Sequence, residues 1–228
     1  ASSRIEGLVL SHRRLSEALF DDREDASGRD AAAFVAGNVR AMERALAIVG
    51  SEPLTVGAII DVHRSLLERT RDARIAGTVR TLQNWIGGSD PTRAEFVPPP
   101  AEHVERLLVD LVAFANRDDI PAFTQAAIVH AQFETIHPFD DGNGRVGRAL
   151  VHLLLRRRGA ARAVVIPLSA SLAERRDDYL AALAANGRGE SHRWIDLFAV
   201  SVARASRRAM EYVDDVRALQ EDWRARLR

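Results

Sequence analysis

The chain has 228 residues, and its 32 basic residues balance its 32 acidic residues. Every basic residue is an arginine, and the chain contains no cysteine. The lack of lysine excludes a P-loop lysine, the strand lysine of protein kinases and Schiff-base catalysis, while the lack of cysteine excludes thiol nucleophiles and disulfides. Because the net charge is zero, no overall field draws the chain onto nucleic acid or anionic lipid, and 46% apolar residues predict a globular protein.

The spacing of apolar residues predicts a helical protein. Residues 8–20, 31–49 and 55–68 carry apolar side chains three and four positions apart, which is the period of a helix. The same spacing predicts later helices over residues 101–116, 124–136, 149–157, 168–185 and 194–209, followed by an amphipathic run that ends at Arg228. The helix over 149–157 is apolar along most of its length, so we expect it to lie at the centre of the fold.

Residues 76–100 differ from the rest, because glycines and prolines concentrate there. Val79 to Leu82 and Asn84 to Ile86 favour a short hairpin, which the run of prolines after Val97 would end. The fold class that we predict is therefore all-α with one small β-hairpin. No stretch approaches the roughly 20 apolar residues of a membrane span, so we expect a cytoplasmic protein without membrane contact.

The segment from His137 to Arg148, HPFDDGNGRVGR, concentrates groups that can do chemistry between two predicted helices. Pro138 disfavours helix at His137, so the preceding helix should stop there and leave the imidazole facing a loop. Gly142 and Gly144 allow the backbone to turn tightly and to present bare N–H groups at the positive start of the next helix. These features predict an anion-binding loop beside a base.

Charged residues follow the glycines. Arg145 and Arg148 are three positions apart at the start of a helix, so both guanidinium groups can reach one polyphosphate, and the Asp141 carboxylate suits Mg²⁺. A glycine-rich helix start with surface arginines would explain these parts singly, but their coincidence favours a site. Glu134 and His137 have the spacing of one half of a di-iron site, but the sequence has no second copy of that spacing.

The segment resembles the signature of the Fic family, HPFx[DE]GNGRxxR, at every fixed position. The resemblance covers about residues 54–202 and includes Gln83 to Gly88, Phe96 to Pro100, Tyr179 and Asn186. It implies a Fic-type helical bundle that transfers AMP from ATP, with Mg²⁺, to a hydroxyl side chain (Tyr, Thr or Ser) of a target protein.

The resemblance also implies roles for individual residues. His137 would be the catalytic base, Asp141 the ligand of Mg²⁺, and residues 84–87 a flap over the site. The implied nucleotide-binding residues are Asn84, Trp85, Ile86, Gly87, Asp141, Gly142, Asn143, Gly144, Arg145, Arg148, Tyr179 and Asn186. From the residues alone, Tyr179 also fits the edge of a core, and Asn186 also fits a helix C-cap before Gly187.

Subclass and regulation follow from two further positions. Doc-type relatives, which transfer phosphate, carry lysine where this chain has Gly144, so glycine argues against that branch; transfer of phosphocholine is a more remote alternative. Ser2 to Gly7 resembles the inhibitory motif of the family, [ST]xxxE[GN], which implies autoinhibition by Glu6 through Arg148. A glutamate in a first helical turn is the structural alternative. Removal of AMP by the same site, or nucleotide binding without transfer, are alternative functions.

The expected organisation has three parts. Residues 1–53 would form an N-terminal helical segment with the inhibitory motif, 54–202 the Fic catalytic core and 203–228 an amphipathic C-terminal helix. We expect a target protein as partner and no direct contact of this segment with nucleic acid. The apolar positions of the last helix are compatible with a homo-oligomer. The start at Ala1 rather than methionine suggests that further segments of the protein flank this one.

Overall fold

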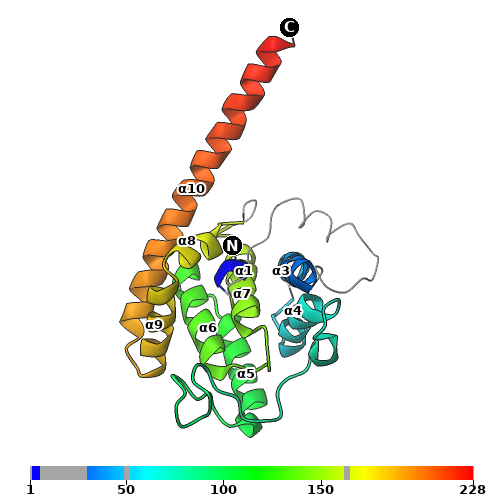
Figure 1. The fold of residues 1–228 in the computed structure, drawn as a ribbon. Coiled ribbons are helices and arrows are strands. Elements are labelled where there is room, and N and C mark those ends of the chain that lie inside the picture. Colours follow the sequence, from blue (N-terminus) through cyan, green and yellow to red (C-terminus); the bar gives the residue numbers. More distant parts are fainter. Residues whose placement is uncertain (1, 6–29, 49–51, 162–164, 228) are drawn as a thin grey trace.

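The computed structural model describes residues 2–5, 30–48, 52–161 and 165–227, and these form a helical body with one long projecting helix (Figure 1). The elements are α1 (Ser2–Ile5), α3 (Asp30–Ala47), α4 (Val56–Leu67), the 3₁₀ turn η1 (Ala73–Ile75), α5 (Ala101–Ala115), α6 (Ala122–Ile136), α7 (Asn143–Arg157), α8 (Leu168–Glu174), α9 (Arg176–Gly187) and α10 (Ser191–Arg226). The prediction of an all-α fold is confirmed. The helix predicted over 8–20 lies outside the described residues.

The predicted hairpin between residues 79 and 86 is not formed. Within the described residues the only β pairing is an isolated antiparallel bridge, which joins Ile86 to Phe96. Gly87 and Gly88 both have φ of +70°, so the chain turns after Ile86 rather than before Asn84. The earlier stretch is engaged elsewhere, because the Arg80 N–H donates to the carbonyl of Pro138 at 2.9 Å.

Helix α7 lies in the middle of the body, as its composition predicts. It packs against α6, α3 and α4, and it begins at Asn143, six positions before the predicted start at 149. Its apolar side chains from Val146 to Leu155 are buried, which anchors the motif loop at its N-terminus to the core.

Two predicted boundaries differ in the structure. The helix predicted over 168–185 is two helices, because Arg175 adopts φ −124° and ψ 41° between α8 and α9. The last two predicted helices are one, since α10 runs for 36 residues and passes through position 203 without a break. Its buried residues end at Ala205, beyond which α10 extends away from the body (Figure 1).

Candidate active site

His137 lies where α6 ends, with an unusual backbone conformation. Its φ of 49° and ψ of 59° place it in the left-handed region, and among the described residues it is the only non-glycine with positive φ. The following Pro138 prevents the helix from continuing, and the His137 N–H still closes the last turn on the Phe133 carbonyl at 2.9 Å. Such conformations cost about 1 kcal/mol or more and are typical of functional sites.

Asn143 holds the loop between His137 and α7 in a closed form. Its side-chain oxygen accepts from the Phe139 N–H at 2.9 Å, and its amide donates to the Phe139 carbonyl at 2.7 Å. Gly142, with φ +84°, forms the N-cap of α7, and a Cβ there would lie 2.8 Å from Leu66. The first N–H groups of α7 therefore point out of a tightly turned loop, which is a geometry that favours anions.

His63 supports this loop from α4. The Gly77 N–H donates to its Nδ1 at 3.0 Å, so the proton of the neutral ring lies on Nε2, which donates to the Asp141 carbonyl at 3.0 Å. The ring stacks on Phe139 with centroids 3.7 Å apart. Burial lowers the pKa of His63 from 6.5 to about 4, so the neutral tautomer that this arrangement needs is present at neutral pH.

A cavity of about 220 Å³ opens beside His137. Its wall comes from α6, α7, α9, α1 and the segment around the Ile86–Phe96 bridge, and the lining residues are Ile5, Ile86, Glu95, Phe96, Glu134, Thr135, His137, Gly144, Arg148, Arg176, Tyr179, Leu180, Leu183 and Ala184. His137, Gly144, Thr135, two arginines and two glutamates supply the polar part of the wall, and aromatic and aliphatic side chains supply the rest. A molecule with an anionic end and a flat apolar end matches these two parts.

Tyr179 is fixed at the apolar part of the wall. It is 1% exposed, and its hydroxyl lies 2.9 Å from His130 Nε2. Burial lowers the pKa of His130 to about 3, and its ring packs near Trp194 with centroids 5.2 Å apart. The Tyr179 ring is therefore part of a rigid aromatic cluster rather than a mobile surface group.

The two motif arginines take different directions. Arg148 lines the cavity, whereas Arg145 is absent from the described wall. The Arg145 Nη2 pairs with the Asp141 carboxylate at 2.7 Å, and its guanidinium lies over the Phe34 ring at 3.6 Å. Of the two guanidinium groups expected to face one ligand, the structure thus places that of Arg148 in the described wall, while Asp141 and Phe34 of α3 hold that of Arg145.

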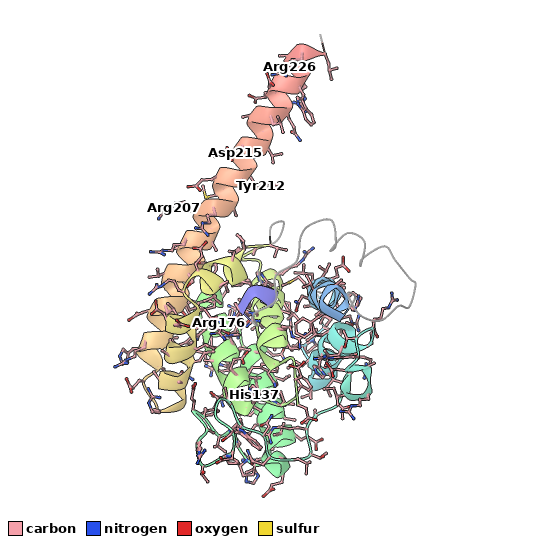
Figure 2. The ribbon with its side chains drawn as sticks, in the orientation of Figure 1. His137, Arg176, Arg207, Tyr212, Asp215 and Arg226 are labelled. Atoms are coloured by element: carbon pink, nitrogen blue, oxygen red, sulfur yellow. The ribbon has the colours of Figure 1, made fainter. Side chains whose placement is uncertain are left out.

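Helix α1 contacts both arginines of the cavity. The Arg148 Nε donates to the Ser2 hydroxyl at 3.0 Å, and the Arg176 Nε donates to the Ile5 carbonyl at 2.7 Å. Ile5 is 3% exposed and forms part of the cavity wall. Figure 2 shows Arg176 beside α1, above the end of α6 that carries His137. Glu6, the residue expected to inhibit, lies outside the described residues.

The remaining expected residues divide between the wall and its surroundings. Ile86 lines the cavity, while the described wall does not include Asn84, Trp85, Gly87 or Asn186. The Asn84 amide donates to the Phe139 carbonyl at 3.2 Å, and the Trp85 side chain is 40% exposed. Arg176 is a cavity residue that the sequence did not single out, although it lies one helical turn before Tyr179, on the same face of α9.

Asp141 is the residue whose position fits Mg²⁺. Its side chain is 49% exposed, and one of its oxygens pairs with Arg145. Mg²⁺ commonly binds through one or two carboxylates and completes its shell with water and phosphate oxygens, so a single accessible carboxylate beside a helix N-terminus fits the ion. Among the described residues, no three His, Asp or Glu side chains form a ready-made metal cluster.

The fold and the cavity define a helical domain in which a strained histidine and the N-terminus of the next helix face one cavity. Residues 53–155, which are just under half of the chain, match the model of the Fic/DOC family. None of the described helices is both long and apolar enough to cross a membrane.

Individual relatives agree with this assignment. The chain is 29% identical over 180 residues to the protein adenylyltransferase fic-1 of Caenorhabditis elegans, an overlap of 78% of this chain and 30% of that protein. The corresponding Caenorhabditis briggsae protein is 33% identical over 133 residues, which are 57% of this chain and 24% of that protein. The chain thus spans about a quarter to a third of the length of these curated relatives.

Solved structures show the same fold. A structure of Fic-1 from C. elegans superposes with a TM-score of 0.72 at 26% identity, over 93% of this chain and 62% of that one. A Fic family protein from Desulfovibrio desulfuricans superposes with a TM-score of 0.77 at 23% identity, over 92% and 62%.

Proposed function

We propose that this domain transfers AMP from ATP to a hydroxyl side chain of a target protein. The observation that carries the proposal is that His137, the N-terminal turn of α7 at Gly144 and Arg148 line one cavity together with aromatic and aliphatic side chains. That combination suits a nucleoside at the apolar part, phosphates at the helix N-terminus and a base at the reacting centre. The names of the curated relatives, which are protein adenylyltransferases, support the same activity.

The reaction needs one proton transfer and one exchange of bonds at phosphorus. Neutral His137 accepts the proton of the target hydroxyl while the hydroxyl oxygen forms a bond to the α-phosphorus. The bond from that phosphorus to the oxygen bridging to the β-phosphate breaks, and pyrophosphate leaves. The N–H groups at Gly142 to Gly144 bind the α-phosphate, and Arg148 binds the outer phosphates. Hydrogen-bond donors are therefore already in place for the negative charge that develops in the transition state.

Asp141 would hold Mg²⁺, and the bound ion would offset the negative charge of the phosphates. Arg145 pairs with this carboxylate and so orients it. In this proposal Arg145 acts on the metal ligand rather than on the outer phosphates. Tyr179 and Ile86 would contact the nucleoside, because both lie in the apolar part of the wall.

Autoinhibition is the second part of the proposal. Arg148 donates to Ser2 and Arg176 donates to Ile5, so α1 lies against the part of the cavity that we assign to the phosphates. A volume of about 220 Å³ is also below the roughly 300 Å³ at which ligand pockets usually begin. Glu6 follows α1 directly in the sequence and would strengthen this contact by pairing with Arg148.

The test compares the parent chain with Glu6→Gly and with Glu6→Gly combined with His137→Ala, each incubated with ATP and Mg²⁺. Intact-mass spectrometry should find an added adenylate on the chain or on proteins of a lysate for Glu6→Gly, and none for the double variant. Replacing the exposed His103 by alanine in the Glu6→Gly background is the matched control and should keep activity. ATP binding without any transfer would instead support the nucleotide-binding module.

Removal of AMP is distinguished by the reverse incubation. A protein already carrying AMP is mixed with the parent chain and with Glu6→Gly in the absence of ATP. Loss of the label with the parent alone would mean that Glu6 serves hydrolysis, and that addition is not the main reaction. If the protein keeps its AMP with both chains, the result supports addition of AMP, which is the reaction proposed here.

A further inference from the structure

Arg80 is a buried cation outside the motif, and its contacts converge on the motif loop. It is 2% exposed, and none of the ion pairs among the described residues joins it to a carboxylate. A buried guanidinium remains charged and must be compensated by acceptors. Here those acceptors are backbone carbonyl groups, and the residues to which they belong show which segments Arg80 holds together.

Three of the carbonyls belong to the turn that carries His137. The Arg80 Nε donates to the His137 carbonyl at 2.8 Å, and its Nη2 donates to the Ile136 carbonyl at 3.3 Å. The Arg80 main-chain N–H donates to the Pro138 carbonyl at 2.9 Å. A single residue thus binds three successive carbonyls at the C-terminus of α6, where unpaired carbonyls and the helix dipole favour a cation.

Two further carbonyls belong to the segment on the other side of the cavity. The Arg80 Nη1 donates to the Leu82 carbonyl at 3.0 Å, and its Nη2 donates to the Pro99 carbonyl at 2.6 Å. These two residues flank residues 83–98, which we call the flap segment. The flap segment contains the Ile86–Phe96 bridge, and both bridge residues line the cavity.

We propose that Arg80 is a positioning residue, which holds His137 in its left-handed conformation and fixes the flap segment relative to it. A left-handed histidine persists only where its surroundings determine it, and Arg80 supplies the donors that do so at the residue itself and at both neighbours. The planar guanidinium suits this task because its N–H groups point in several fixed directions, whereas a lysine offers its donors from one atom. The inference deepens the proposed function and rests on it.

The C-terminal end of α7 offers a matched control for Arg80. Arg158 also donates to several oxygens, namely the carbonyls of Arg117, Asp118 and Ile120 and the side chain of Gln125. Arg80→Lys and Arg158→Lys therefore remove similar hydrogen bonds, but Arg158 contacts neither His137 nor the flap segment. If Arg80 acts by positioning His137, only Arg80→Lys should change the His137 signal and the rate of transfer. If the lost hydrogen bonds affect stability alone, the two variants should behave alike.

The experiment uses both variants in the Glu6→Gly chain. Histidine-labelled NMR, with the His137 signal assigned by comparison with His137→Ala, reports on the imidazole without any reaction. We expect the chemical shift and titration of His137 to change in Arg80→Lys and to stay as in the parent in Arg158→Lys. We also expect kcat for adenylate transfer at saturating ATP to fall about 10- to 100-fold in Arg80→Lys alone, with a smaller change in KM for ATP.

The opposite result is equally clear. If Arg80→Lys lowers the stability to urea as Arg158→Lys does, but leaves the His137 signal and kcat unchanged, Arg80 is a structural residue and the inference is wrong. If Arg80→Lys does not fold, Arg80→Gln, which keeps one donor group at the site, is compared in the same way. If even the Glu6→Gly parent transfers nothing, the proposed function fails, whereas the His137 signal still decides the role of Arg80.

Discussion

Three buried histidines should make the stability of this domain depend steeply on pH. Burial lowers the pKa of His63 to about 4, of His130 to about 3 and of His152 to about 4, from a usual value of 6.5. In the unfolded chain each ring binds a proton below about pH 6.5, while in the folded chain it stays neutral until the pH nears its lowered pKa. The stability that these rings contribute is therefore fully present above about pH 6.5 and is lost as the pH falls toward 4 and 3.

The pKa values set the size of the effect. Between about pH 7 and pH 5, the unfolded chain gains nearly one proton per histidine that the folded chain does not bind. The free energy of unfolding then falls by about 2 kcal/mol for each ring, or about 5 to 6 kcal/mol for all three. Small domains are stable by only about 5 to 15 kcal/mol in total, so we expect the domain to be close to unfolding near pH 5.

Urea titrations followed by far-UV circular dichroism, at several pH values across this range, measure the slope directly. His152 is on α7 but is not part of the cavity wall, and His152→Leu removes its titrating group, so this variant should reduce the slope by about one third. His192→Leu, at an exposed position, is the control and should leave the slope as in the parent. A free energy of unfolding that stays level down to about pH 5, or a slope unchanged by His152→Leu, would refute the reasoning.

Glycine substitutions and metal removal give three further predictions. A Cβ at Gly147 would clash with Glu134 Oε1 and lie 3.1 Å from Phe133, so Gly147→Ala should destabilise the domain by about 1 to 3 kcal/mol in thermal unfolding. Gly57→Ala, where a Cβ would make only an ordinary contact with Thr55 at 3.7 Å, should not. Gly142→Ala should cost about 1 to 2 kcal/mol because of its φ of +84°. Chelation of Mg²⁺ should abolish adenylate transfer, and Asp141→Asn should raise the Mg²⁺ concentration that restores it.

The helices and the motif loop were predictable because their causes are local. Apolar spacing gave α3 and α4 to within two residues at each end, and the prolyl ring after His137 gave the end of α6. The predicted turn at Gly142 is likewise present, with the left-handed φ that a glycine allows. In each of these cases the physical reason lies within a few positions of the residue concerned.

The parts that sequence reasoning missed depend on contacts between distant positions. The periodicity of 168–185 runs through Arg175, so the break between α8 and α9 leaves no local signal. Arg80 stands in a segment interpreted as a strand, yet its hydrogen bonds reach the His137 turn and Pro99. His63 shows the same limit, because nothing around it in sequence indicates that it binds the Asp141 carbonyl.

The motif itself therefore combines two kinds of residue that its spacing cannot separate. His137, Gly144 and Arg148 face the cavity, while Asn143 closes the loop on Phe139. In the proposed function, residues of the second kind would contribute to reactivity through geometry, since a left-handed histidine and a tightly turned helix start are stable only while their supports are in place. It follows that substitutions at these supports should change the reaction rate through the position of the imidazole, and not through lost contacts with the nucleotide.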